Sequence, residues 1–330
     1  MSRPMLLAAV ALASYALLSN LASLMAMAAW QSGWLSRQEG PPAIRTRRLV
    51  MLRAFPAAAA GIVVSLLVMP AFVIFEPVRA TEPVGPVLIG LALAGLGLLG
   101  TGFATAATSA LATWRVERRW LRAARPLDFD PPAGVPAYAV DSFTPIVALV
   151  GVFAPKLIAA RTIIDACNQD ELARIVAHER GHLRARDNLK RWLMACAPDL
   201  LRWTPAHHAI VLAWDDAAED AADDAATAGQ EVARLDLAAL LVKVARLSAG
   251  PGWTAATISP FIERDRLDRR VRRLLSSTQH PGAHRSAPVQ VLVGTAIVVV
   301  LTIASSPAAM KTVYEAVEAV VAFGRPPSLP

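Results

Sequence analysis

The segment His178-Glu179-Arg-Gly-His182 contains the residues of this chain whose types and spacing best fit a catalytic metal site. Residues four apart on a helix share one face, so the two imidazoles could bind a single zinc ion. Glu179 would then lie beside them, where its carboxylate could accept a proton from a water molecule at the metal. The pattern alone does not establish such a site, because two histidines and a glutamate can also be ordinary helix surface.

The residues before this segment predict the helix that it requires. Asn168 and Glu171 have the three-residue spacing of a capping pair, which predicts a helix start. Apolar side chains then continue at helical spacing, at Leu172, Ile175 and Val176. We therefore expect both histidines on one face of this helix.

A third ligand is needed, because a catalytic zinc ion usually has three protein ligands and one open position. The dense acidic cluster of the chain spans residues 214–224, and Glu219 and Asp223 stand four apart within it. Glu219 could be the third ligand, and Asp223 could orient a ligand imidazole through its free N–H. A solvated acidic helix face is the alternative, and the upstream H-E-x-x-H favours the metal site over it.

The composition departs from that of a soluble globular protein. Hydrophobic residues make up 55% of the chain and charged residues 18%, whereas about 25% charged is usual, and intrinsic disorder is excluded for most of the length. The apolar residues form four uncharged runs long enough to cross a bilayer, centred on about residues 5–29, 54–75, 84–113 and 288–305. In the first run, Ala26-Met27-Ala28 also fits a cleavage site, so a cleaved signal peptide is the alternative there.

Basic residues near the predicted spans set the expected orientation, since Lys and Arg of short loops stay on the cytoplasmic side. Arginines are concentrated between the first and second runs and directly after the third. We therefore expect a multi-pass protein of the cytoplasmic membrane with both termini outside. Its expected parts are three spans within residues 1–114, a cytoplasmic domain at 115–287, a fourth span at 288–305 and a short outer tail at 306–330.

The same distribution explains the net charge of +7. The surplus of basic residues marks the side of the bilayer that each segment faces, and no fold signature of nucleic-acid binding accompanies it. We therefore expect the lipid bilayer as a partner and no direct contact with nucleic acid.

Two further segments bear on the expected domain. Residues 142–155 are uncharged, too short to span a bilayer and rich in Val, Ile and Phe, which indicates a buried strand; its part 144–152 could offer an edge to an extended substrate. Residues 261–275 alternate apolar side chains with arginines and predict a helix. This helix could lie on anionic lipid headgroups, or it could pack on the core with a solvated arginine face.

The order of three spans, an H-E-x-x-H domain and a fourth span resembles the BlaR/MecR-type membrane zinc metallopeptidases, the beta-lactam sensor-transducers and their shorter relatives. The likeness covers residues 1 to about 305, and its specific parts are Ala177–Leu183 with Arg186–Asn188, Leu201–Pro205 and Glu219–Asp223. It implies a multi-pass α-helical membrane protein with an inserted α+β zincin-like metallopeptidase domain of the gluzincin type. By that likeness one zinc ion is bound by His178, His182 and Glu219, with Glu179 as the general base and Asp223 orienting a ligand.

The chain departs from the family pattern in two places. The family often has Cys directly before the final Asp of the last motif, where this chain has Ala222, and no proposed ligand is affected. The antibiotic sensors also carry an outer penicillin-binding domain with a nucleophilic S-x-x-K serine. Only about 25 residues follow the last predicted span here, so we expect no beta-lactam acylation by this chain.

The resemblance implies an endopeptidase that cleaves a cytoplasmic or membrane-associated regulatory protein, such as a transcriptional repressor, in a signalling relay. A quality-control protease for membrane proteins is an alternative, but those relatives usually place spans between the H-E-x-x-H and the third ligand, where residues 183–218 have none. A non-catalytic receptor with the zinc fold is another, and the intact Glu179 argues against it. Candidates for stabilising the oxyanion, which the sequence does not rank, are His207, His208, Arg186 and Tyr138.

Overall fold

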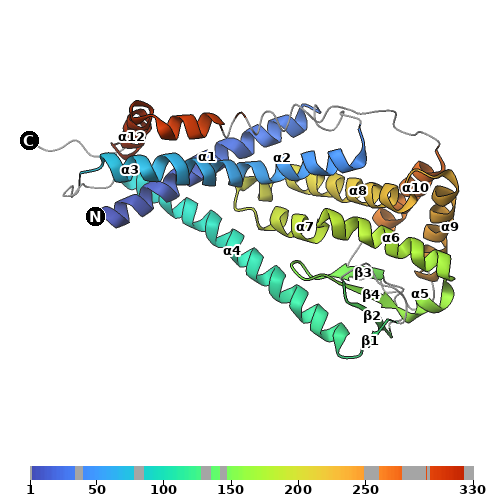
Figure 1. Ribbon diagram of the computed structural model, residues 1–330. Coiled ribbons are helices and arrows are strands. Elements are labelled where there is room, and N and C mark those ends of the chain that lie inside the picture. Colours follow the sequence, from blue (N-terminus) through green and yellow to red (C-terminus); the bar gives the residue numbers. More distant parts are fainter. Residues whose placement is uncertain are drawn as a thin grey trace, which may run out of the picture.

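The computed structural model describes residues 2–33, 40–77, 85–127, 135–141, 147–248, 260–276, 295 and 298–322. These residues are mostly helical and include one small β-sheet (Figure 1). The long apolar helices lie together at the amino-terminal end of the chain, and the helix that carries the H-E-x-x-H segment lies beside the sheet (Figure 1).

Three helical segments are long and apolar enough to cross a membrane. They are α1 (Arg3–Gln31), the continuous run Pro42–Phe75 and α4 (Pro86–Leu121), and they contain the first three predicted runs. Large apolar side chains such as Leu24, Ile74 and Phe103 are exposed on these helices, as expected where lipid is the solvent. Of the fourth predicted run, only residues 295 and 298–305 are described, and these are helical.

The second of these segments is helical throughout despite two prolines in its interior, Pro56 and Pro70. It consists of α2 (Pro42–Val63), the π-helical turn η1 (Val64–Val68) and α3 (Met69–Phe75). The π-helical turn ends two residues before Pro70. In a regular α-helix the Pro70 ring would clash with the carbonyl four residues earlier, which lies within this turn. Such local adjustments, together with neighbouring helices, are how membrane helices accommodate proline.

α1 packs against both α2 and α4. At the closest point, a Cβ added at Gly95 would lie 2.1 Å from the carbonyl oxygen of Leu12, so the two backbones meet with no room for a side chain. Near the other end of α1, Ala26 is buried in one cluster with Trp214 of the following domain. This packing favours a retained first helix over a cleaved signal peptide.

The sheet has four strands in the order β1-β2-β4-β3. The strands are β1 (Arg125–Pro126), β2 (Ala137–Val140), β3 (Val147–Val150) and β4 (Lys156–Ala160). β4 pairs in parallel with β2 and antiparallel with β3, which leaves β3 at one edge. The strand predicted within residues 142–155 is thus confirmed as β3, but its predicted burial is wrong, because all four residues of this edge strand are half-buried. Residues 142–146 lie outside the described residues.

The remaining domain is helical. Its elements are α5 (Arg161–Ala166), α6 (Gln169–Ala185), α7 (Asp187–Cys196), the 3-10 turn η2 (Leu200–Trp203), α8 (Pro205–Thr227), α9 (Glu231–Ser248) and α10 (Pro260–Leu275). α8 contacts α2 of the apolar bundle as well as α6 and α9 (Figure 1). One helix therefore connects the bundle with the part of the domain that carries the H-E-x-x-H segment.

A buried ion pair lies where α8 meets the bundle. The guanidinium of Arg53 in α2 donates to both carboxylate oxygens of Asp199, at 2.8 and 3.1 Å, and both side chains are 0% exposed. The Arg53 Nε also donates to Nδ1 of His207, in the first turn of α8, over 2.8 Å. This Arg53 joint, formed by Arg53, Asp199 and His207, fixes the start of α8 to the second apolar segment.

The expected outer tail contains a helix that the sequence analysis did not predict. α12 (Pro307–Ala322) packs against the second apolar segment, and Met310 is buried with Leu67 and Ala71. The Tyr314 hydroxyl donates to Glu76 over 2.8 Å. These contacts hold α12 against the end of the bundle that carries the amino terminus (Figure 1).

Candidate metal centre

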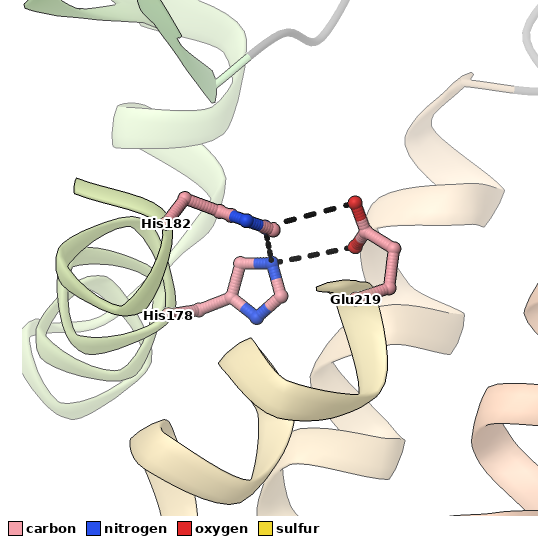
Figure 2. Close-up of side chains that lie close together, drawn as sticks. All are labelled: His178, His182 and Glu219. Atoms are coloured by element: carbon pink, nitrogen blue, oxygen red, sulfur yellow. Dashed lines mark hydrogen bonds and ion pairs between the residues drawn. The ribbon is translucent and has the colours of Figure 1, made fainter. Parts of the chain in front are cut away.

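α6 begins where its sequence predicts. The Asn168 side chain accepts from the Glu171 backbone N–H, and the Glu171 carboxylate accepts from the Asn168 N–H, each over 2.9 Å. The predicted capping pair is thus confirmed as a reciprocal capping box. In the last two turns of the helix, His178 and His182 project from the same face of α6 (Figure 2).

Glu219 of α8 faces both histidines (Figure 2). Nε2 of His178 lies 3.5 Å from Oε2 of Glu219, and Nε2 of His182 lies 3.6 Å from Oε1. The two Nε2 atoms are 3.2 Å apart. One ligand atom from each of these three residues lies within 4.8 Å of the others, so the structure brings together the three side chains predicted to bind metal.

A glycine allows α6 and α8 to come this close. A Cβ added at Gly181 would lie 3.0 Å from Cα and 3.3 Å from Cβ of Ala222. Gly181 stands one residue before His182, and Ala222 stands three residues after Glu219. The contact therefore sets the separation of the imidazoles from the carboxylate. Ala222, the position where the family pattern often has Cys, is a packing residue here.

Each histidine has a carboxylate at the ring nitrogen that points away from the cluster. Nδ1 of His178 lies 3.1 Å from Oδ1 of Asp223, and Nδ1 of His182 lies 2.8 Å from Oδ2 of Asp187. A carboxylate at Nδ1 favours the tautomer with the proton on Nδ1, which leaves the Nε2 lone pair free for a metal ion. The orienting position predicted for Asp223 agrees with this geometry.

Asp187 was missed as a site residue, although it stands five residues after His182 in the quoted motif. α6 ends at Arg186, whose φ of 55° and ψ of 44° put it in the left-handed region, and α7 begins at Asp187. This abrupt turn brings the buried Asp187 carboxylate back towards the His182 ring. A left-handed conformation is unfavourable for a non-glycine residue, and such strain often occurs at functional sites.

Glu179 lies between the metal cluster and the edge of the sheet. Burial raises the pKa of its carboxyl, while the nearby His178 and His182 and a hydrogen bond from the Leu149 backbone lower it, with a net upward shift. Asn188 donates to the carbonyl oxygens of Leu149 and Gly151, each over 2.9 Å. The outer edge of β3 is therefore held against the site by two side chains, and an elevated pKa suits a carboxylate that must accept and return protons.

A cation from α10 contacts the acidic side of the cluster. Arg270 lies 2.9 Å from Oε2 of Glu219 and makes two hydrogen bonds to Asp223, of 2.6 and 3.0 Å. Burial alone would raise the pKa of both carboxyls, but contacts with His178 and Arg270 outweigh burial and lower both pKa values. Burial lowers the pKa of His178, but its contacts with Asp223 and Glu219 outweigh this and raise it to about 9.

Four arginines of α10 pair with the acidic cluster of α8, which corrects two interpretations made from sequence, whereas Arg272 is exposed and pairs with Asp268 of its own helix. Arg266 pairs with Asp215 and Asp216, Arg269 with Asp216 and Asp220, Arg270 with Glu219 and Asp223, and Arg273 with Asp220 and Asp224. These four side chains therefore form neither a face that binds lipid headgroups nor a fully solvated face. The packing part of the second alternative is confirmed, since Leu274 is buried with Leu237 of α9.

A cavity of about 330 Å³ opens beside His182. Its lining is largely apolar, with Asp187, Asn188 and Arg186 as polar members, and includes Leu149, Val152, Phe153, Pro155, Leu183 and Leu189. Arg186 is the candidate for oxyanion stabilisation that lies in this cavity wall. His207 instead belongs to the Arg53 joint, about 18 Å along α8 from Glu219 at 1.5 Å per residue.

The donor set fits a zinc ion by its chemistry. Two imidazole nitrogens and one carboxylate oxygen are the ligands of catalytic zinc sites in which a fourth position stays open. Nδ1 of His182 is hydrogen-bonded to Asp187, whereas Nδ1 of His178 lies within ion-pair distance of Asp223 without making a hydrogen bond. The Glu219 side chain is 32% exposed, so one side of the cluster is accessible to water. No further residue has to move into the cluster to complete a three-ligand set.

An H-E-x-x-H helix, a facing acidic helix and an adjacent edge strand, joined to apolar helices of spanning length, are the features of a membrane metallopeptidase. Residues 141–274 match the family model described as BlaR1 peptidase M56. The match confirms the resemblance to BlaR/MecR-type peptidases and supports a peptidase activity. The matched segment includes the His178 cluster and Arg270. No curated protein and no solved structure matches the chain.

Proposed function

We propose that this protein is a membrane-embedded zinc endopeptidase with a zincin-like domain of the gluzincin type. The observation that carries the proposal is the convergence of His178, His182 and Glu219 from two helices, with ligand atoms within 4.8 Å of one another. The M56 match over residues 141–274 supports the same class independently of this geometry.

The residues of the cluster have distinct tasks in the proposed reaction. His178, His182 and Glu219 would hold one zinc ion, which would supply a Lewis acid that polarises a water molecule and the scissile carbonyl. Glu179 accepts the proton of the attacking water and returns it to the leaving amine, and its raised pKa suits both steps. Asp187 and Asp223 keep the imidazoles oriented.

The site is suited to an extended peptide. β3 is an edge strand, and an extended chain can pair through backbone hydrogen bonds with the part of that edge that Glu179 and Asn188 do not already occupy at Leu149 and Gly151. The cavity beside His182 offers apolar walls, including Phe153 and Leu183, to one side chain of that peptide. We infer an endopeptidase that takes a protein segment with an apolar residue next to the scissile bond.

The proposed location is the cytoplasmic membrane, with several passes and the peptidase domain on the cytoplasmic side. Three spanning helices support membrane association. Trp30, near the end of α1, packs in one cluster with Trp214 of the domain. The domain therefore lies at the end of the bundle where α1 ends and the arginine-rich first turns of α2 begin. Basic loops remain cytoplasmic, which favours this orientation.

By family likeness, the substrate would be a regulatory protein such as a repressor, and cleavage would be one stage of a signalling relay. A quality-control protease with spans between its zinc ligands is disfavoured. Residues 183–218 are described throughout, and they form α7, η2 and part of α8 without a candidate span. A receptor without catalysis is disfavoured by the position of Glu179 between the cluster and β3.

The test is Glu179→Gln in the full-length protein, purified in detergent beside the parent. We expect about one zinc ion per chain in both and cleavage of a co-expressed repressor or an unfolded model substrate by the parent alone. Asp170→Asn, an exposed change in the first turn of the same helix, serves as the control and should retain cleavage. Equal cleavage by the parent and Glu179→Gln would refute the proposed base, and absence of zinc from the parent would refute the metal site.

A further inference from the structure

The guanidinium of Arg270 bridges two carboxylates of the metal centre. Its Nη1 lies 2.9 Å from Oε2 of Glu219, and its Nε and Nη2 donate to the two oxygens of Asp223 over 3.0 and 2.6 Å. Three nitrogens of one rigid, planar group thus contact the carboxylates of Glu219 and Asp223, which stand four apart on α8. The Arg270 side chain is 14% exposed, so water competes little for these contacts.

This bridge differs from the other arginine contacts of α10. Arg266, Arg269 and Arg273 pair with α8 carboxylates that make no contact with His178 or His182. Among the arginines and lysines of the described residues, Arg270 is the one that contacts Glu219 and Asp223. Arg270 therefore contacts the metal centre directly, whereas the other three arginines hold α10 against α8.

The bridge has two physical effects on the cluster. Two carboxylates four residues apart on a helix repel each other, and the shared guanidinium offsets this repulsion. The fork also restrains the rotamers of both side chains, because bidentate arginine contacts have fixed geometry that a lysine cannot reproduce. Glu219 is thereby held with Oε1 towards His182, and Asp223 with Oδ1 towards His178.

We propose that Arg270 is a positioning residue of the metal centre, which holds Glu219 and Asp223 in place for binding zinc. The inference rests on the proposed zinc site and goes beyond it, because it makes zinc affinity depend on a residue outside both helices that supply the ligands.

The test compares Arg270→Lys with Arg270→Met in the full-length protein. Zinc dissociation constants are measured by competition with a chromophoric chelator, and the absorption of the cobalt-substituted proteins reports the ligand geometry. Because loss of residues that orient metal ligands typically weakens binding by about 10- to 100-fold, we expect both variants to bind zinc at least about tenfold more weakly. We also expect an altered cobalt spectrum for Arg270→Lys.

The matched controls are Arg269→Lys and Arg269→Met, which remove a contact to Asp220 between the same two helices without touching the cluster. These should lower thermal stability and leave the zinc dissociation constant and the cobalt spectrum unchanged. Equal loss of zinc in the Arg269 and Arg270 variants would overturn the inference in favour of helix docking, and parental affinity in Arg270→Lys would overturn the role of the fork. Absence of zinc from the parent would instead defeat the proposed function itself.

Discussion

Gly181 of α6 and Ala222 of α8 meet at a contact where a Cβ on the glycine would lie 3.0 Å from the alanine Cα. Helix propensity alone favours almost any residue over glycine inside a helix, by up to about 1 kcal/mol. The glycine is therefore explained by packing, since a larger residue would push the two histidines away from Glu219.

We accordingly expect Gly181→Val to reduce zinc content strongly although valine is the better helix former. The measurement is zinc per chain by metal analysis, together with helix content by circular dichroism. Ala173→Val, at an exposed position of the same helix, is the control and should bind zinc like the parent. Full zinc content in Gly181→Val would show that the helices can separate without disturbing the ligands.

Asp187→Asn should weaken zinc binding by about tenfold or more, because the residue orients the His182 ring through a 2.8 Å contact to Nδ1. Asparagine keeps the size of the side chain but loses the charge that favours a proton on Nδ1. A chelator competition assay gives the dissociation constant. Asp170→Asn on the exposed surface is the matched control, and a similar change in both proteins would exclude the specific role of Asp187.

Arg53→Met should destabilise the protein by about 3–5 kcal/mol, because it leaves the Asp199 carboxylate buried without its partner. The double variant Arg53→Met/Asp199→Leu removes both charges and should recover much of that loss. Unfolding midpoints in detergent provide the comparison, with exposed Arg47→Met as the control. If the double variant were no more stable than the single one, the penalty would not come from the unpaired charge.

His207 predicts a pH dependence of stability. Burial and the charges of Arg53, His208 and Arg202 lower its pKa from 6.5 to about 4. The unfolded chain thus binds more protons than the folded one in this range, so the contribution of His207 is complete above pH 6.5 and falls as the pH drops towards about 4.

The variant His207→Gln isolates this contribution, because its amide oxygen can accept from Arg53 but does not titrate. Between pH 6.5 and about 4, the unfolding midpoint of the parent should fall more steeply than that of the variant. The comparison is made as a difference, since other carboxyls titrate in the same range. Parallel curves for the two proteins would contradict the assigned pKa.

The parts of the site that sequence analysis predicted are those encoded over short distances in the chain. The capping box, the shared face of His178 and His182, and the pairing of Glu219 with Asp223 all follow from spacings of three or four residues on a helix. The first three apolar runs were predicted for the same reason, because their length and composition are local properties.

The parts that were missed depend on contacts between distant segments. Arg270 reaches Glu219 from 51 positions along the chain, and Arg53 reaches Asp199 across 146. An arginine-rich helix has the same sequence pattern whether its partner is lipid, water or an acidic helix, so only the fold identifies α8 as the partner of α10. Asp187 was overlooked because its approach to His182 depends on the left-handed conformation of Arg186, and an arginine does not predict such a conformation.

The Arg53 joint fixes the start of α8 to the second apolar segment, so α8 can tilt about that point. Glu219 lies about 18 Å along α8 from His207. A tilt of about one degree moves a point at that radius by about 0.3 Å, which already exceeds the tolerance of about 0.2 Å for distances in a metal site. A displacement of the apolar bundle that tilts α8 would therefore change the distances from Glu219 to His178 and His182.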